Sequence, residues 1–257
     1  MTWLRVLIAF PIGLVFGSFL TVVVHRVPRG ESLVRPRSRC PSCGTQLRAL
    51  DNVPVISWIV LRGRCHACGA TISPVYPLLE LASGALFVGA ALRFPDPFVA
   101  ALMAPFTAVL VAIAVIDVRT KKIPNRIVYP CLVIFPTLIV AGAALGGRID
   151  VPRAGLGFLI YGGGFLALAF ISPRGMGMGD VKLAALIGLV LGSAGLAYVA
   201  TAAALAILLG GAGAIFALFR GLGRKSAIPF GPFLAAGAVA AAFLGEEIAR
   251  TYLSHLG

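Results

Sequence analysis

Apolar segments recur along most of the chain, and most of them approach the length that a bilayer requires, although the one at about 183–192 is shorter. They lie at about 6–24, 78–92, 98–116, 127–145, 154–171, 183–192, 195–219 and 231–245. A transmembrane helix needs roughly 20 predominantly apolar residues, and 59% of this chain is apolar while only 12% is charged. A soluble core does not require so many long apolar runs. We therefore expect an all-α polytopic membrane protein with about eight transmembrane helices.

The first apolar segment contains no small-residue cleavage site of the kind that ends a secretory signal peptide. A single basic residue, Arg5, precedes it. We expect this segment to remain in the protein as a transmembrane helix. The domain organisation that follows is a first helix at 1–24, a polar loop domain at 25–77 and a helical membrane core at 78–257.

The net charge of +13 is unevenly distributed between the two sides of this topology. If successive spans alternate, 17 of the 22 Lys and Arg residues fall on the side of the polar loop. The other side keeps Arg5, Arg93, Arg148, Arg153 and Arg250. Basic loops stay in the cytoplasm and contact anionic lipids. We therefore expect the N-terminus outside, the loop inside, and a lipid bilayer rather than a nucleic acid as the partner.

Two carboxylates lie at the ends of apolar segments on this cytoplasmic side. Asp117 ends the run Pro105–Ile116, and Asp180 closes the glycine-rich run Gly175–Asp180. A carboxylate at the mouth of a membrane span is costly unless it is paired or hydrated, so each is a candidate functional residue. Alternatively, each is a helix cap or an interface residue. Two such acids on one side of the membrane could form a pair that activates water.

The polar loop carries two CxxC motifs, Cys40–Cys43 and Cys65–Cys68, separated by 21 residues. A glycine that permits a tight turn follows each motif, at Gly44 and Gly69. Four thiolates at this spacing are typical of a closed structural zinc site. Two disulfides are the alternative, which the reducing cytoplasm disfavours. We expect a zinc-ribbon-like loop domain whose metal ligands are Cys40, Cys43, Cys65 and Cys68.

Further motifs extend this pattern nearly from end to end. They are Gly17–Leu20, His25–Pro28, Pro54–Trp58, Tyr76–Leu81, Ile123–Asn125, Gly177–Leu183 and Ile228–Phe233. Together with Asp117 and the tetracysteine loop, they resemble the type IV prepilin leader peptidases. These are membrane aspartic proteases with a Gly-x-Gly-Asp signature, which Gly177–Asp180 matches.

The resemblance implies that Asp117 and Asp180 are the catalytic pair of an aspartic endopeptidase. Members of the family cleave short basic leaders from type IV prepilins and pseudopilins at the cytoplasmic face of the bacterial inner membrane. Members with the tetracysteine loop also methylate the new N-terminal amine with S-adenosylmethionine. This chain has all four cysteines, so the resemblance implies the bifunctional type.

Glu80, which opens the second span, has three possible roles. It is an interfacial residue, a partner for a loop arginine, or a part of the methyl-transfer site that holds the substrate's new amine. The cofactor-binding residues are not otherwise identified, because no glycine-rich nucleotide fingerprint occurs in the loop.

Three other functions fit parts of the pattern. The first is a peptidase without methyltransferase activity. The second is a proton-coupled transporter that uses Asp117 and Asp180 as relay sites, although the two acids lie at one face and inverted repeats are absent. The third is a zinc-ribbon scaffold at the membrane, which would tolerate the loss of both aspartates.

Overall fold

The computed structural model describes residues 2–172, 176–220 and 229–254. Two residues of the motifs named above, Gly175 and Ile228, lie outside these ranges, and so does the side chain of Arg250.

Helices dominate the described residues. The long ones are α1 (Thr2–Arg26), α3 (Val75–Arg93), α4 (Pro97–Thr120), α5 (Asn125–Ala144), α8 (Met178–Ala194), α9 (Leu196–Phe219) and α10 (Gly231–Ser254). Between α5 and α8 lies a continuous rod made of α6 (Val151–Gly157), a π-helical turn (Phe158–Gly162) and α7 (Gly163–Ile171). Each expected apolar segment overlaps one of these rods. The predicted all-α polytopic fold is therefore confirmed.

Six helical rods among the described residues are long and apolar enough to cross a membrane. They are α1, α3, α4, α5, the α6–α7 rod and α9. The expected count of eight is therefore approximate. The apolar part of α10, Gly231–Gly245, is shorter, and α8 has 17 residues, among them Asp180 and Lys182.

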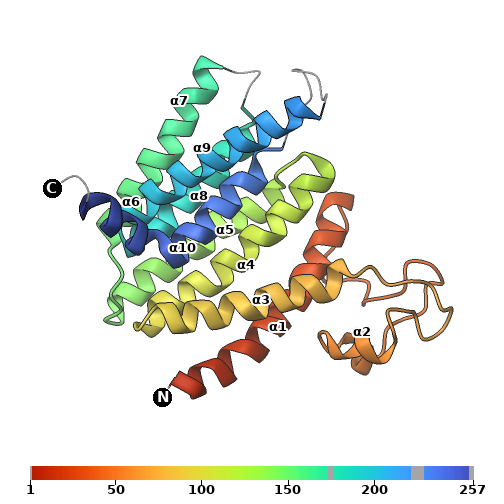
Figure 1. Cartoon of the computed structure of the whole chain (residues 1–257). Coiled ribbons are helices and arrows are strands. Elements are labelled where there is room, and N and C mark those ends of the chain that lie inside the picture. The colour runs from red at the N-terminus through yellow and green to blue at the C-terminus, as the bar shows by residue number, and fades with distance from the viewer. Residues whose placement is uncertain (1, 173–175, 221–228, 255–257) are drawn as a thin grey trace.

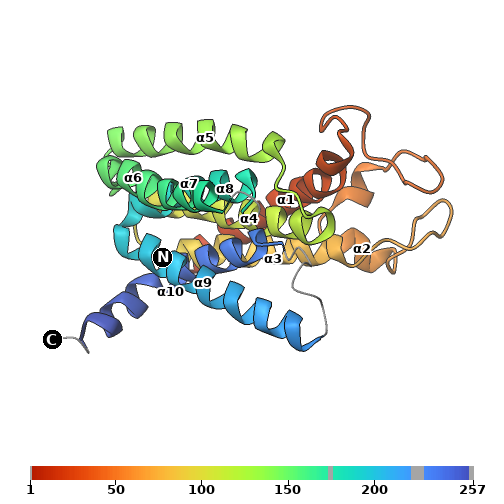
Figure 2. The ribbon, with the colours of Figure 1, turned by 90° about the horizontal axis from the view of Figure 1, so that it is seen from above.

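Helix α8 is short and partly polar because protein surrounds it on most sides. It packs against α4, α5, α6, α7, α9 and α10, and Figure 2 shows it between α5 and the pair α9 and α10. Its contact with α6 is especially close: a Cβ atom at either Gly157 or Gly188 would collide with the other residue's backbone. Packing of this kind, rather than the hydrophobic effect, holds helices together in lipid.

The connections between helices gather at two opposite ends of the bundle (Figure 1). One end holds the α3–α4, α5–α6 and α8–α9 turns, where Arg148 N–H donates to Asp96 and Asp150 N–H donates to Ser193. The other end holds the C-terminus of α4 and the first turns of α8 and α10, which meet around Ile123. The polar loop leaves the bundle at this second end, from α1 and α3 (Figure 1).

The loop has little regular structure beyond η1 (Val27–Arg29), η2 (Ala49–Asn52) and α2 (Ile56–Val60). Arg26, a buried cation at the end of α1, anchors the segment of the loop that follows this helix. The guanidinium donates to the carbonyls of Ser32 at 2.9 Å and Pro36 at 2.8 Å. Buried charges need such partners, so Arg26 fixes the path of the chain as it leaves the membrane helix.

Candidate active site

Asp117 lies near the C-terminus of α4 and is only 4% exposed. Its Oδ2 accepts a hydrogen bond of 3.0 Å from the backbone N–H of Gly231, the first residue of α10. The first N–H groups of a helix have no partner within the helix, and a carboxylate is favoured at that position. Asp117 therefore occupies the start of α10, 114 residues further along the chain.

The approach of Gly231 to Asp117 leaves no space for a side chain at position 231. A Cβ atom there would lie 2.6 Å from Asp117 Oδ2 and 3.3 Å from Ile123 Cδ1. In the sequence, Gly231 belongs to the Ile228–Phe233 motif, which by itself indicates no role for it. The available signal was a glycine at the start of an apolar segment and next to Pro232, but nothing local links it to Asp117.

Asp180 lies in the first turn of α8 and is half-buried. Gly177 occupies the N-cap position of this helix, so Asp180 is not the cap. A Cβ atom at Gly177 would lie 3.1 Å from Asp180 Oδ2. The absence of a side chain at Gly177 therefore leaves open the space beside the carboxylate.

The structure brings Asp117 and Asp180 to the same end of the bundle. Ile123 lies close to residues beside both acids. A Cβ atom added at Gly179, next to Asp180, would be 3.0 Å from the Cβ atom of Ile123, and one added at Gly231 would be 3.3 Å from its Cδ1 atom. The two carboxylates are near enough for the charge of Asp117 to act on Asp180. Two acids from different helices thus lie within electrostatic reach of each other at one end of the bundle.

Lys182 ties the first turn of α8 to α5. Its Nζ donates to Asn125 Oδ1 at 3.1 Å and lies 4.7 Å from the centre of the Tyr129 ring. Cation–π contacts of this length are attractive. Asn125 and Tyr129 therefore help to fix the helix that carries Asp180.

The four loop cysteines lie together, in two turns with the same hydrogen-bonding pattern. In each turn the first cysteine's carbonyl accepts from the glycine that follows the motif, Gly44 or Gly69, and both glycines have φ of 72°. A non-glycine residue rarely adopts such a φ. Isolated bridges, Arg39 with Gln46 and Arg64 with Thr71, close the two turns.

The sulfur atoms of these cysteines fit a tetrahedral metal site. All four lie within 4.8 Å of one another, and those of Cys40 and Cys68 are 3.8 Å apart. Zn–S bonds of about 2.3 Å place tetrahedral sulfurs about 3.8 Å apart. All four thiols are free, with no disulfide. Hydrogen bonding to Thr45 lowers the pKa of the Cys43 thiol to about 6, so this ligand is readily ionised.

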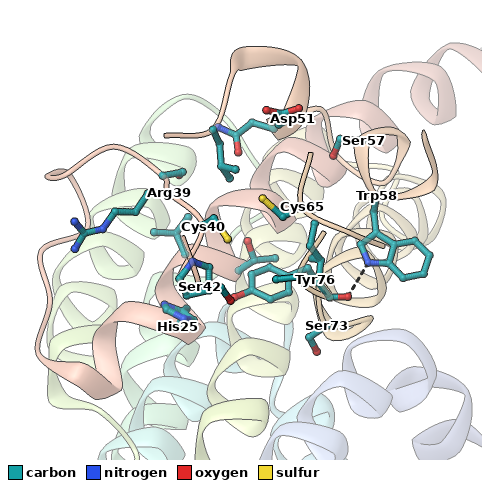
Figure 3. Close-up of a pocket in the computed structure, with 18 of the residues that line it drawn as sticks. His25, Arg39, Cys40, Ser42, Asp51, Ser57, Trp58, Cys65, Ser73 and Tyr76 are labelled. Carbon is teal, nitrogen blue, oxygen red and sulfur yellow. Dashed lines mark hydrogen bonds between the residues drawn. The ribbon is translucent and has the colours of Figure 1, made fainter. Parts of the chain in front are cut away.

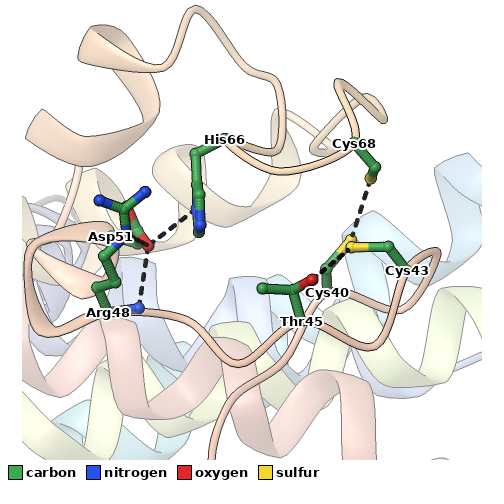
Figure 4. Close-up of polar contacts among 7 residues, drawn as sticks. All are labelled: Cys40, Cys43, Thr45, Arg48, Asp51, His66 and Cys68. Carbon is green, nitrogen blue, oxygen red and sulfur yellow. Dashed lines mark hydrogen bonds and ion pairs between the residues drawn. The ribbon is translucent and has the colours of Figure 1, made fainter.

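A close contact between two side chains lies beside the second cysteine turn. His66, within this turn, places Nδ1 3.1 Å from Asp51 Oδ2 (Figure 4). The same oxygen accepts from the backbone N–H of Arg48 at 2.9 Å. His66 therefore contacts η2, so the second cysteine turn packs against this part of the loop.

A cavity of about 630 Å³ lies between the loop and the ends of α1 and α3. Figure 3 shows Tyr76 and His25 in its wall together with the two buried cysteines, Cys40 and Cys65. Trp58 also lines the cavity and donates from Nε1 to the carbonyl of Ile72 at 3.1 Å (Figure 3). The cysteine turns thus form part of the wall of this cavity.

Glu80 lines this cavity and is 8% exposed. Its Oε2 accepts from the backbone N–H of Val55 at 2.8 Å, and the Ser18 side chain also donates to the carboxylate. Glu80 is therefore buried between α1, α3 and the loop, rather than paired with a loop arginine. Of the roles expected for it, the structure leaves a structural one and one in methyl transfer.

Val55 has a backbone conformation that β-branched residues rarely adopt. Its φ is 63° and its ψ is −50°, and Ile56 N–H donates to the Pro54 carbonyl at 2.6 Å. This is the strained form of the γ-turn. The hydrogen bond to Glu80 helps to hold the turn, which directs the Pro54–Trp58 motif over the cavity.

Two family profiles and several relatives match the chain. The profile described as "Bacterial Peptidase A24 N-terminal domain" matches residues 12–94, and that of the "Type IV leader peptidase family" matches residues 104–218. A "Prepilin leader peptidase/N-methyltransferase" from Bacillus subtilis (strain 168) is 36% identical over 249 residues, covering 96% of this chain and 97% of the relative. The chain belongs to the type IV leader peptidase family.

Other relatives carry the same name. The one from Burkholderia pseudomallei (strain 1026b) is 39% identical, covering 95% of this chain and 87% of the relative. The one from Dichelobacter nodosus is 33% identical, covering 93% of this chain and 92% of the relative. No solved structure matches the chain significantly.

The two matched regions divide the candidate residues between them. Asp117 and Asp180 fall within the leader peptidase region, while Glu80 and the four cysteines fall within the N-terminal domain of the family. The expected family is therefore confirmed, and the chain is a multi-pass membrane protein of that family with six candidate spans among its described residues.

Proposed function

We propose that the chain is a prepilin leader peptidase and N-methyltransferase. It cleaves the leader from type IV prepilins and pseudopilins and then methylates the new N-terminal amine. The names of relatives that match nearly the whole chain support both activities. They give no support to a proton-coupled transporter. The observation that carries the peptidase activity is the meeting of Asp117 and Asp180 at one end of the bundle.

Asp117 and Asp180 are the catalytic residues of this proposal. Two neighbouring carboxylates share one proton, because two charges in a poorly hydrated site repel each other. The ionised acid takes a proton from water as the water oxygen attacks the scissile carbonyl carbon, and the other acid donates its proton to the carbonyl oxygen. The C–N bond then breaks, and the leaving amine takes up a proton. Gly231 N–H holds one oxygen of Asp117 in place for this exchange.

In this proposal the loop domain at 25–77 and the peptidase core at 78–257 have different roles. Zn²⁺ bound by Cys40, Cys43, Cys65 and Cys68 would hold the loop folded. A closed four-thiolate site leaves no open position for substrate, so the ion's contribution is structural. The spacing of the four sulfur atoms supports this assignment.

S-adenosylmethionine is the proposed methyl donor. When bound, it supplies a methyl group: the neutral N-terminal amine forms a bond to the methyl carbon as the C–S bond breaks, its electron pair stays on sulfur, and the nitrogen loses one proton. Glu80 belongs to the methyl-transfer site in this proposal, since it lines the cavity that the loop covers.

The proposed orientation places both sites in the cytoplasm of a bacterium, at the inner membrane. The N-terminus then lies outside. The support is the charge distribution, with 17 of 22 basic residues on the side of the loop. Asp117, Asp180 and the loop share one end of the bundle, so one orientation serves both activities.

The experiment combines purified enzyme in detergent with a prepilin-type substrate and S-adenosylmethionine, followed by mass spectrometry of the product. Wild type should release the leader and add one methyl group. Asp117→Ala and Asp180→Ala should each reduce cleavage by at least about 10³-fold, because each removes one half of the proton exchange. Asp150→Ala, at the opposite end of the bundle, is the control. Normal cleavage by either active-site variant would overturn the assignment of the pair. A cleaved product without the methyl increment would reduce the function to peptidase alone.

A further inference from the structure

The short helix α2 has two different faces. Ser57 and Trp58, on its inner face, line the cavity between the loop and the membrane helices. Its outer face consists of Ile56, Ile59 and Val60, which are 60%, 62% and 73% exposed. Their spacing in the sequence places the three side chains together on one side of the helical turn. Apolar side chains exposed singly need no explanation, but a contiguous group of them marks an interaction surface.

The outer face of α2 lies beside the membrane helices rather than beyond their ends. Val55, directly before α2, donates its N–H to Glu80 in the second turn of α3 at 2.8 Å, and Figure 1 shows α2 beside the loop-side end of α3. A Cβ atom at Gly17 would lie 2.7 Å from the Cα atom of Glu80. Gly17 is nine residues, or about 13 Å, from the last residue of α1. At this level of α3, Leu78 and Leu81 are 61% and 41% exposed, as lipid-facing residues are.

A second part of the loop lies beside α1. Leu33 and Val34 line a hollow of about 360 Å³ together with Phe19 and Val22 of α1. Val34 is 80% exposed and Phe19 is 50% exposed. The loop therefore continues the apolar surface of the bundle at two places, next to α1 and next to α3.

Basic side chains border the outer face of α2. Arg62 and Arg64 follow the helix and are exposed, and the side chain of Arg48 is 67% exposed. The segment 25–77 has eight arginines and only two acidic residues. Aliphatic groups bordered by cations match the boundary between acyl chains and headgroups, where long basic side chains reach the phosphates. A protein partner, in contrast, would have to approach α2 at the level where lipid surrounds α3.

We propose that the outer face of α2 inserts into the leaflet at the loop's end of the bundle. Acyl chains then surround the three aliphatic side chains, and lipid phosphates contact Arg62 and Arg64. The loop is held by the bilayer as well as by its contacts with α1 and α3. Since Trp58 on the inner face lines the cavity, the bilayer fixes one wall of that cavity from outside. This contact is separate from leader cleavage and from methyl transfer.

The test measures tryptophan quenching in the full-length, zinc-loaded protein, reconstituted in nanodiscs of phosphatidylcholine and phosphatidylglycerol. The chain has two tryptophans, Trp3 and Trp58, and Trp3→Phe is the background. Val60→Trp in this background labels the outer face of α2. The matched control is Ala67→Trp, at an exposed position of the second cysteine turn. Brominated phosphatidylcholine quenches tryptophan among the acyl chains, and acrylamide quenches tryptophan in water.

Brominated lipid should quench the tryptophan added by Val60→Trp about threefold more strongly than the one added by Ala67→Trp, because the apolar face of an interfacial helix lies about 5–10 Å into the bilayer. Acrylamide should give the opposite order. Ile59→Trp, on the same face, should behave as Val60→Trp does, and zinc content and the thermal unfolding midpoint verify that each variant is folded. If acrylamide quenches both outer-face variants as strongly as Ala67→Trp, the face lies in water and the proposal is overturned in favour of a protein partner.

Nanodiscs of phosphatidylcholine alone separate the apolar contact from the electrostatic one. Brominated lipid should still quench the tryptophan of Val60→Trp, since insertion of an apolar face does not require charged lipid. Quenching should be stronger with phosphatidylglycerol, and Arg62→Gln combined with Arg64→Gln should remove this increase. A complete loss of quenching in neutral nanodiscs would contradict insertion. An increase that persists in the double variant would contradict the contact between these arginines and the headgroups.

Discussion

The carboxylates at the two ends of the helical bundle differ in how many hydrogen bonds they accept. At one end, Asp96 accepts three backbone N–H groups, from Phe98, Val99 and Arg148. At the other end, Asp117 is almost fully buried and accepts one N–H from Gly231 among the residues that the structure describes. Asp96 thus satisfies a helix start and a neighbouring turn, whereas Asp117 keeps most of its hydrogen-bonding capacity.

This difference distinguishes Asp96, which has a structural role, from Asp117, the proposed catalytic acid. Buried polar groups are normally hydrogen-bonded, and one with spare capacity calls for a functional explanation. In the sequence both residues simply adjoin apolar runs. Their hydrogen bonds distinguish them, because Asp96 finds two of its three donors in its own helix and Asp117 finds its donor in a distant one.

The connections at the two ends differ in the same way. At the Asp96 end the turns are short and bonded directly to each other, as in the Asp150 to Ser193 backbone contact. At the Asp117 end, the long loop depends on side chains that reach it from the membrane helices, Arg26 and Glu80, and on the tetracysteine site. We therefore expect the second end to respond strongly to changes that leave the first unaffected.

Removal of the metal should produce the largest contrast between the ends. Structural zinc contributes about 10–16 kcal/mol to small domains of this type, so chelation should unfold the cysteine turns. Hydrogen exchange with mass spectrometry should show at least tenfold faster exchange across 38–72 and no change across 145–150. Added Zn²⁺ should restore protection. Unchanged exchange in the loop would mean that Arg26 and Glu80 suffice to fold it.

Gly231→Ala should have the next largest effect, since its added methyl group would displace the Asp117 carboxylate. Misplacement of a catalytic group by about 1 Å can cost about 10²-fold. We expect kcat for leader cleavage to fall 10- to 100-fold while KM changes little, because Gly231 acts through Asp117.

Gly211→Ala is the matched control for this variant. Gly211 lies in α9, and a Cβ atom there would meet nothing within 4 Å. Its cleavage rate should equal that of wild type. A Gly231→Ala enzyme with normal kcat would show that the start of α10 does not orient Asp117.

Counting the apolar segments, which cross the membrane in alternating directions, explains why the sequence could predict that Asp117 and Asp180 lie on one side. Counting spans puts the end of the third and the start of the sixth at the same side, and the structure brings Asp117 and Asp180 to one end of the bundle. The count works even though α8 is not one of the six candidate spans. Each rod reverses the direction of the chain, whether it faces lipid or protein.

Contacts between distant segments could not be predicted in this way. Gly231 and Asp117 are joined by packing that no local pattern records, and the bond from Val55 to Glu80 depends on the path of the loop. For Glu80, a loop arginine was one of the partners that the sequence allowed, beside a position at the interface and a role in methyl transfer. The actual donors, a backbone N–H and the Ser18 side chain, leave no trace in composition.

The smallest effect is expected at the structural acid. The pKa of Asp96 is lowered, first by the N–H of Arg148 and also by those of Val99 and Phe98. A carboxyl whose folded pKa lies below its unfolded pKa stabilises the protein at pH values above the unfolded pKa, about 3.9, and this contribution is lost as the pH falls through the folded pKa.

Asp96→Ala should therefore cost about 1 kcal/mol at pH 7, as for other helix caps. The difference from wild type should shrink below about pH 4. Thermal unfolding in detergent at the two pH values measures it, and leader cleavage by the variant at pH 7 should stay within about twofold of wild type. A loss of cleavage as large as that of Gly231→Ala would mean that the two ends are coupled through α4, the helix that joins Asp96 to Asp117.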